Sequence, residues 1–168
     1  MRLFSIQSLS AYRELVNTGR YVCDGTKSEY VLEWTGFKEA YEWLSARMAE
    51  RIGPPPEGVI YPVWAWPAAV EHFSNDLKPG QVKIEFEAPR DRILLSNFEG
   101  WHAVINDYFF AESFEEYDDF EEMEADEKEI AKIDSWEKIF DKTPLDKCQA
   151  TLWELKLSNV TGVTFPDY

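Results

Sequence analysis

The sequence predicts a single α+β domain in which helices pack around a mixed, strongly bent β-sheet. Segments with the alternation of β-strands lie at both ends of the 168-residue chain, and segments with helical spacing fall irregularly between them. No internal repeat is visible. Hydrophobic residues make up 45% of the chain, enough for one core at this length. We therefore treat residues 1–168 as one domain.

The N-terminal half begins with strand-like and then helical patterns. Residues 2–7 alternate between two faces and predict a first strand. A helix then follows from Ser8 or Ser10, and Gly19 ends it. The clearest helical stripe predicts a helix over 35–51, and the glycine and three prolines after it stop that helix.

The middle of the chain predicts two strands and a helix. Residues 59–66 are rich in β-formers, and Pro62 places this strand at a sheet edge or a bulge. Residues 82–86 alternate and predict a strand with one buried face. Ser96 and Glu99 have the spacing of a capping box, which opens a helix.

Residues 151–157 alternate and predict a late strand that carries Glu154 among hydrophobic neighbours. Two arrangements stay open. If the face of Trp153 is core, Glu154 faces solvent and pairs with a base. If the sheet bends around a cleft, Glu154 lies on the wall of that cleft. A last extended stretch follows over 160–165.

The net charge of −15 is concentrated in one window. Residues 107–129 contain twelve acidic side chains and one lysine, with aromatic residues every three or four positions. This pattern predicts an acidic, amphipathic helical segment over 107–130. Its field repels nucleic acid and anionic membranes and attracts basic proteins. We therefore expect no direct nucleic-acid binding and no membrane association, and either a solvated surface or a docking face for a basic partner.

Several familiar features are missing from the sequence. There is no signal-peptide pattern and no apolar run of membrane-spanning length, so we expect a cytoplasmic protein. Cys23 and Cys148 lie far apart and predict free thiols. No nucleophile elbow, phosphate-binding loop or zinc motif occurs, and we expect no metal. His102 is either a general base or a surface imidazole.

Four strings carry a resemblance over almost the whole chain: LFSIQSLSAYRELVNTG, RIGPPPEGVIYPVWAW, EFEAPRDRILLSNFEGWHAVIN and QATLWELKLSNV. In this order they resemble the bacterial and phage family known as domain of unknown function 3841. That resemblance implies a family but no activity.

The order of elements is more faintly similar to the ADP-ribosyltransferase superfamily. That likeness implies that NAD binds beside a first-strand residue, Ser5 or Gln7, and that a late-strand glutamate, Glu154, polarises its ribose. It departs from the superfamily at Leu152, since no Glu or Gln lies two residues before Glu154. The aromatic wall that stacks on nicotinamide would consist of Tyr61, Trp64 or Trp66.

Two functions from different classes follow. The first is an ADP-ribosyltransferase-like protein that binds NAD or a related nucleotide in an aromatic-lined cleft, with Glu154 and His102 as catalytic candidates and Gln7, Tyr61, Trp64 and Trp66 around the cofactor. A further candidate is a small-molecule or nucleotide-binding module that uses the region of Trp64 and Trp66 with His102. The alternative is a non-catalytic acidic interaction protein, such as a phage or host-defence antagonist, that docks a basic protein surface.

Overall fold

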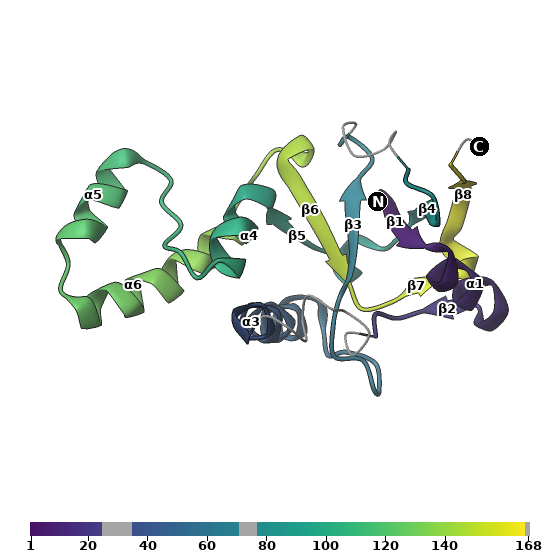
Figure 1. The fold of residues 1–168 in the computed structure, drawn as a ribbon, viewed down its shortest axis with the longest axis horizontal. Coiled ribbons are helices and arrows are strands. Elements are labelled where there is room, and N and C mark those ends of the chain that lie inside the picture. Colours follow the sequence, from purple (N-terminus) through teal and green to yellow (C-terminus); the bar gives the residue numbers. More distant parts are fainter. Residues whose placement is uncertain (25–34, 71–76, 167–168) are drawn as a thin grey trace.

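The structure, a computed structural model, describes residues 1–24, 35–70 and 77–166 and has the expected α+β architecture (Figure 1). Its main element is a six-stranded sheet whose pairings are all antiparallel, rather than mixed. Each strand of this sheet therefore runs in the direction opposite to its neighbours. A parallel pair of consecutive strands would need a crossover connection. In spatial order the strands are β5 (Leu94–Asn97), β6 (Cys148–Leu152), β3 (Val63–Pro67), β1 (Arg2–Ser8), β4 (Gln81–Glu87) and β8 (Val160–Thr164).

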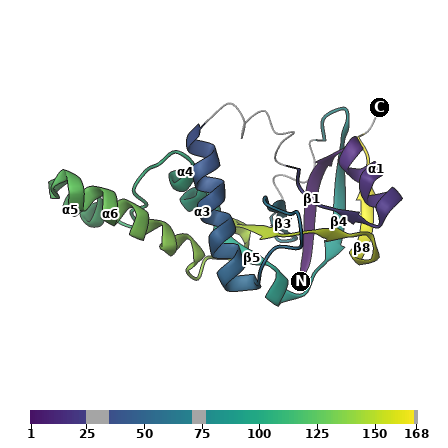
Figure 2. The same ribbon diagram turned by 90° about the horizontal axis from the view of Figure 1, so that it is seen from below.

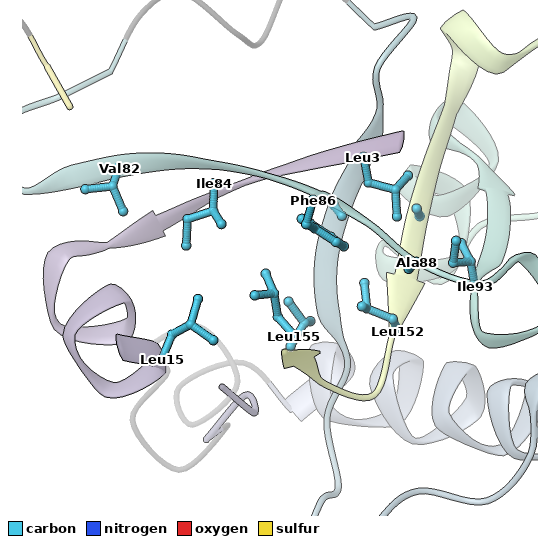
Figure 3. Close-up of a cluster of buried hydrophobic side chains, with 12 residues drawn as sticks. Leu3, Leu15, Val82, Ile84, Phe86, Ala88, Ile93, Leu152 and Leu155 are labelled. Atoms are coloured by element: carbon cyan, nitrogen blue, oxygen red, sulfur yellow. The ribbon is translucent and has the colours of Figure 1, made fainter. Parts of the chain in front are cut away.

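A two-stranded sheet, β2 (Arg20–Tyr21) with β7 (Leu155–Lys156), faces the main sheet together with α1 (Leu9–Thr18). Ser8 caps α1, and Gly19 ends it in the left-handed conformation at φ 77°. The first hydrophobic core lies between these elements and the main sheet (Figure 3). It includes Leu15 from α1 and Leu155 from β7 opposite the alternating Val82, Ile84 and Phe86 of β4.

A second core lies around α3 (Thr35–Ile52) and α4 (Phe98–Ile105). The helical stripe predicted for α3 is confirmed, because Leu44, Met48 and Ile52 are buried in this core. Trp101 of α4 and Trp153, which follows β6, pack in the same cluster. The first core therefore lies against α1 and the small sheet, and the second core lies against α3 and α4.

The acidic window forms two helices, α5 (Phe114–Glu122) and α6 (Ala125–Trp136), instead of one. The chain turns between them at Met123 and Glu124, and the Glu124 and Glu127 side chains form a reciprocal capping box that starts α6. We call residues 107–136 the acidic arm. In both views the arm extends away from the sheet, beyond α4 (Figures 1 and 2).

Short 3₁₀ helices complete the fold: η2 (Arg90–Arg92), η3 (Glu137–Phe140), η4 (Leu145–Lys147) and η5 (Leu157–Asn159). Across the described parts of the chain, no helix is both long and apolar enough to cross a membrane.

Three local predictions were wrong. β3 is an interior strand between β1 and β6, and Pro62 precedes it, so that its missing N–H costs the ladder nothing. The cap of α4 is Asn97, the last residue of β5, whose side chain accepts the Gly100 N–H, while Ser96 lies one position earlier and is buried in the strand. The strand predicted over 151–157 breaks at residues 153–154, since its two halves pair with different sheets.

Candidate functional site

Two of the candidate aromatic residues, Tyr61 and Trp64, meet at Tyr41 of α3. The Trp64 indole N–H donates to the Tyr41 hydroxyl at 3.2 Å. The Tyr41 ring also makes edge-to-face contacts with Tyr61 and with Trp101 of α4. Burial raises the pKa of the Tyr41 hydroxyl. These rings pack α3 against the sheet, an arrangement that suits a core better than an open stacking wall.

Trp66 and His102 lie at a second place and are linked through Phe98. The Phe98 ring lies 5.1 Å from the Trp66 ring and 4.4 Å from the His102 ring, centroid to centroid. His102 is exposed, and its Nδ1 is 2.9 Å from the Phe98 carbonyl oxygen of its own helix. The imidazole is therefore directed along α4.

Gln7 lies near the end of β1, and its side chain is hydrogen-bonded to Ser5 of the same strand. Its amide donates to the Ser5 hydroxyl at 2.7 Å, and that hydroxyl donates to the Trp64 carbonyl oxygen at 2.6 Å. Ser5 is completely buried. This polar chain ties β1 to β3.

Glu154 lies between two cations where the chain passes from β6 to β7. Its carboxylate oxygens are 2.6 Å from Arg20 Nε and 3.0 Å from Lys156 Nζ. The side chain is 23% exposed. The sequence left two arrangements open for Glu154, a solvent-facing pair with a base and a place on the wall of a cleft, and the structure combines them. Glu154 pairs with bases and also lies on a pocket wall.

That pocket, the Glu154 pocket, has a volume of about 680 Å³, within the range of small-molecule sites. Its apolar lining comes from the first core, from three prolines and from Trp153, whose indole N–H donates to the Gly53 carbonyl oxygen. Arg92 also lines it, and in the described parts of the chain this guanidinium has no ion-pair partner.

A second pocket of about 670 Å³ lies at the base of the acidic arm, and we call it the arm-base pocket. It combines aromatic and acidic side chains. Trp66 and Phe98 form one corner of its lining, and Phe110 reaches it from the arm. Its charged lining residues, among those the structure describes, are Glu99, Glu112, Asp146 and Lys147, which together carry a net charge of −2.

The two ends of the arm are tied together at its base, and Trp136 joins them to the body in the second core, where its ring contacts Trp43 of α3. The Trp136 indole N–H donates to the Tyr108 carbonyl oxygen at 2.8 Å, and the Phe110 N–H donates to the buried Ser135 hydroxyl at 2.9 Å. Lys132 Nζ lies 2.8 Å from an Asp107 carboxylate oxygen. These three contacts hold the two ends of the arm side by side.

The outer part of the arm exposes apolar side chains among its acids. Phe114 is 92% exposed and Ile130 is 66% exposed. Of the eleven large hydrophobic side chains exposed in the described residues, six belong to the arm: Tyr108, Phe114, Tyr117, Met123, Ile130 and Ile133. α5 contains no buried residue at all. The arm is therefore an unpartnered apolar surface as well as an acidic one.

The six sequence candidates thus fall into separate groups rather than around one cleft. Tyr61 and Trp64 share Tyr41, Trp66 and His102 share Phe98, and Glu154 lies in a pocket that contains none of the other candidates. The sequence analysis recognised neither pocket as a set of residues that lie together. Phe110 could have been noticed in the sequence, because it is the first of the aromatic residues that recur every three or four positions in the acidic window.

No group of three or more His, Cys, Asp or Glu side chains in the described parts of the chain is arranged to hold a metal ion. Cys23 and Cys148 are free thiols in the structure, and burial raises the pKa of both.

The fold and its surfaces define an antiparallel α+β domain with an acidic helical arm. The model of the family named domain of unknown function (DUF3841) matches residues 2–161, and the chain belongs to this family. Neither the curated proteins nor the solved structures contain a match. The comparisons therefore lend no support to the ADP-ribosyltransferase likeness.

Proposed function

We propose that this protein is an interaction module whose acidic arm docks a basic surface of a partner protein. The observation that carries the proposal is the exposure of six large hydrophobic side chains on an acidic, outward-directed arm. Large exposed apolar patches rimmed by polar residues mark protein-binding sites. Here the rim is almost entirely acidic.

The charge of the arm selects the kind of partner. The arm contains thirteen acidic side chains and two lysines, which gives a net charge of −11. Two copies of the arm would repel each other, so a second copy of this chain is a poor occupant. A basic partner gains from the same field, which accelerates its association.

The acids of the outer arm are available to a partner. Lys128, Lys132 and Lys138 neutralise acids near the base and between the two helices. In the described parts of the chain, no cation lies within ion-pair distance of four exposed acids of α5, which are Glu115, Asp118, Asp119 and Glu122.

The test compares an arm variant with a matched body variant. The arm variant neutralises the four acids of α5 by Glu115→Gln, Asp118→Asn, Asp119→Asn and Glu122→Gln. The body variant removes the same charge from exposed positions by Glu14→Gln, Glu39→Gln, Glu57→Gln and Asp91→Asn. A partner captured by cross-linking to the unmodified protein is purified, and its association is measured at several salt concentrations.

We expect a basic partner whose association rate falls about tenfold or more with the arm variant and changes little with the body variant. Its salt dependence should also weaken with the arm variant. A third variant, Phe114→Ser with Ile130→Ser, should mainly speed dissociation. A partner that binds equally to all variants would show that the arm is not the docking surface.

A second candidate function is binding of NAD or a related nucleotide in the Glu154 pocket. One observation favours it: Arg92 lines this pocket without an ion-pair partner in the described chain and can hold a phosphate. Glu154 contributes less to this proposal, because both its oxygens already lie against cations.

Thermal unfolding with and without NAD, ATP and pyrophosphate tests the second candidate. A ligand at 100 times its Kd raises the free energy of unfolding by about 2.7 kcal/mol, which is readily measured as a rise in Tm. The rise should disappear with Arg92→Gln and persist with Arg13→Gln, an exposed arginine of α1. No rise with any of the three ligands rejects this function.

A further inference from the structure

The arm-base pocket has the chemistry of a receptor for a basic side chain. Its lining brings together three aromatic residues and three carboxylates in one hollow of about 670 Å³. A guanidinium or ammonium group is attracted by aromatic faces and by carboxylates, and both attractions grow when water is displaced. We propose that this pocket receives an arginine or lysine side chain of the partner that docks on the acidic arm.

The aromatic part of the pocket has two walls that meet at an angle. The Trp66 and Phe98 rings are 5.1 Å apart with an interplanar angle of 63°, so they form a corner rather than a flat stack. Phe110 lines the pocket from the arm side, and its backbone is held by Ser135. A cation in such a corner meets more than one ring at once.

The three acidic residues that line the pocket lie on three separate segments of the chain. Glu99 lies in the first turn of α4, Glu112 lies in the arm just before α5, and Asp146 lies in η4 before β6. In the described chain, none of these carboxylates lies within ion-pair distance of a cation. Among the described residues that line the pocket, Lys147 is the single base. The net charge of −2 favours a cation over an anion.

The position of the pocket connects it to the arm. Phe110, Ala111 and Glu112 line the pocket and lead directly into α5. A partner lying along the arm therefore reaches the pocket without crossing the rest of the domain. The volume also exceeds that of one side chain, so residues beside the basic group can enter with it.

This inference rests on the proposed function, but its test needs no partner. The probes are Nα-acetyl-arginine amide and Nα-acetyl-lysine amide, and their neutral counterparts are the citrulline amide and the Nε-acetylated lysine amide. Binding is followed by NMR through the indole N–H signal of Trp66, which a Trp66→Phe variant assigns. The variant Glu112→Gln with Asp146→Asn reduces the charge at exposed positions, and Glu57→Gln with Asp91→Asn is its control.

We expect the cationic probes to shift the Trp66 signal in a saturable way and the neutral probes to bind at least fivefold more weakly. The pocket variant should lose about tenfold in affinity for the cationic probes, and the control variant should match the unmodified protein. Equal binding of charged and neutral probes, or equal binding to both variants, overturns the inference.

The partner experiment separates the two proposals. If the arm variant releases the partner and the pocket variant does not, the arm docks the partner and the pocket has no part in it. If the cationic probes bind but no basic partner depends on the arm, the proposed function fails while the pocket chemistry stands. In that case the assignment of the pocket to a partner side chain is overturned.

Discussion

Arg20 and Glu154 join β2 to the connection between β6 and β7, with Arg20 Nε only 2.6 Å from a Glu154 carboxylate oxygen. β2 pairs with β7, so this ion pair reinforces a two-stranded sheet with only two residue pairs in its register. Isolated two-stranded ribbons are marginal, and this one depends on its packing against the first core.

The variant Glu154→Gln should destabilise the fold only slightly. The Arg20 and Glu154 side chains are 42% and 23% exposed, and such pairs contribute about 0.5–1 kcal/mol. Urea unfolding of the variant and of a double-mutant cycle with Arg20→Gln measures the coupling. Glu57→Gln is the control at an exposed site. A loss of several kcal/mol would mean that the pair is far less solvated than its exposure indicates.

Gly100→Ala should be destabilising, although the same change usually stabilises a helix by about 1 kcal/mol. A Cβ at this position would lie 2.8 Å from a methyl carbon of Ile139 and 3.1 Å from the Phe110 ring. Ile139 is fully buried and cannot easily move, so we expect a loss of about 1–3 kcal/mol in the free energy of unfolding.

The control for Gly100→Ala is the same change in an Ile139→Ala background, which removes the nearest methyl group. There the substitution should be much less costly or even stabilising. An equal loss in both backgrounds would show that the contact with Ile139 is not the cause.

Alkaline pH should unfold the protein partly through Tyr21. Burial of Tyr21 against the first core raises its pKa from 10.0 to about 12, with smaller contributions from Cys23, Glu14 and Asp24. The folded state then holds the phenolic proton more tightly than the unfolded state. This stability is fully present below pH 10 and is lost as the pH rises from 10 to about 12.

Urea unfolding between pH 9 and pH 12 measures this effect. The variant Tyr21→Phe should flatten the fall in stability over that range, and Tyr108→Phe, at an exposed tyrosine, should leave it unchanged. An unchanged fall with Tyr21→Phe would assign the alkaline transition to other groups.

Amide hydrogen exchange should differ sharply between α5 and β6. α5 has no buried residue, whereas all five residues of β6 are buried within the sheet. Local opening of α5 therefore breaks few apolar contacts, and its amides should exchange orders of magnitude faster than those of β6. Comparable protection by mass spectrometry would mean that the arm is covered in solution. Binding of the proposed partner should slow exchange in α5 selectively.

Much of the fold follows from local patterns. Val82, Ile84 and Phe86 alternate with polar residues, and they form the buried face of β4 as predicted. The spacing of Leu44 and Met48 identified α3, and Gly19 marked the end of α1. These signals are readable because each reflects the period or the termination of one element.

The C-terminal strand shows where local patterns fail. Residues 151–157 alternate without interruption, but the chain leaves β6 after Leu152 and enters β7 at Leu155. The choice between the two sheets depends on partners far away in sequence, Val63 in one case and Tyr21 in the other. The period of a segment contains no information about such partners.

The candidate functional residues were likewise predictable only in part from the sequence. Glu154, Trp66 and the acidic window were recognisable by residue type. That Trp66 lies with Phe98, Phe110 and Glu112 around one hollow, apart from Glu154, depends on the packing of three segments that are distant in sequence.

The sequence by itself determined the α+β class, the family and the concentration of negative charge in one window, because composition and periodicity are properties of the chain. Only the tertiary structure decided that this window folds into two helices directed away from the sheet, with Phe114 and Ile130 left uncovered. Burial depends on which surfaces meet across long stretches of chain, and for the outer arm no described part of this domain supplies the second surface.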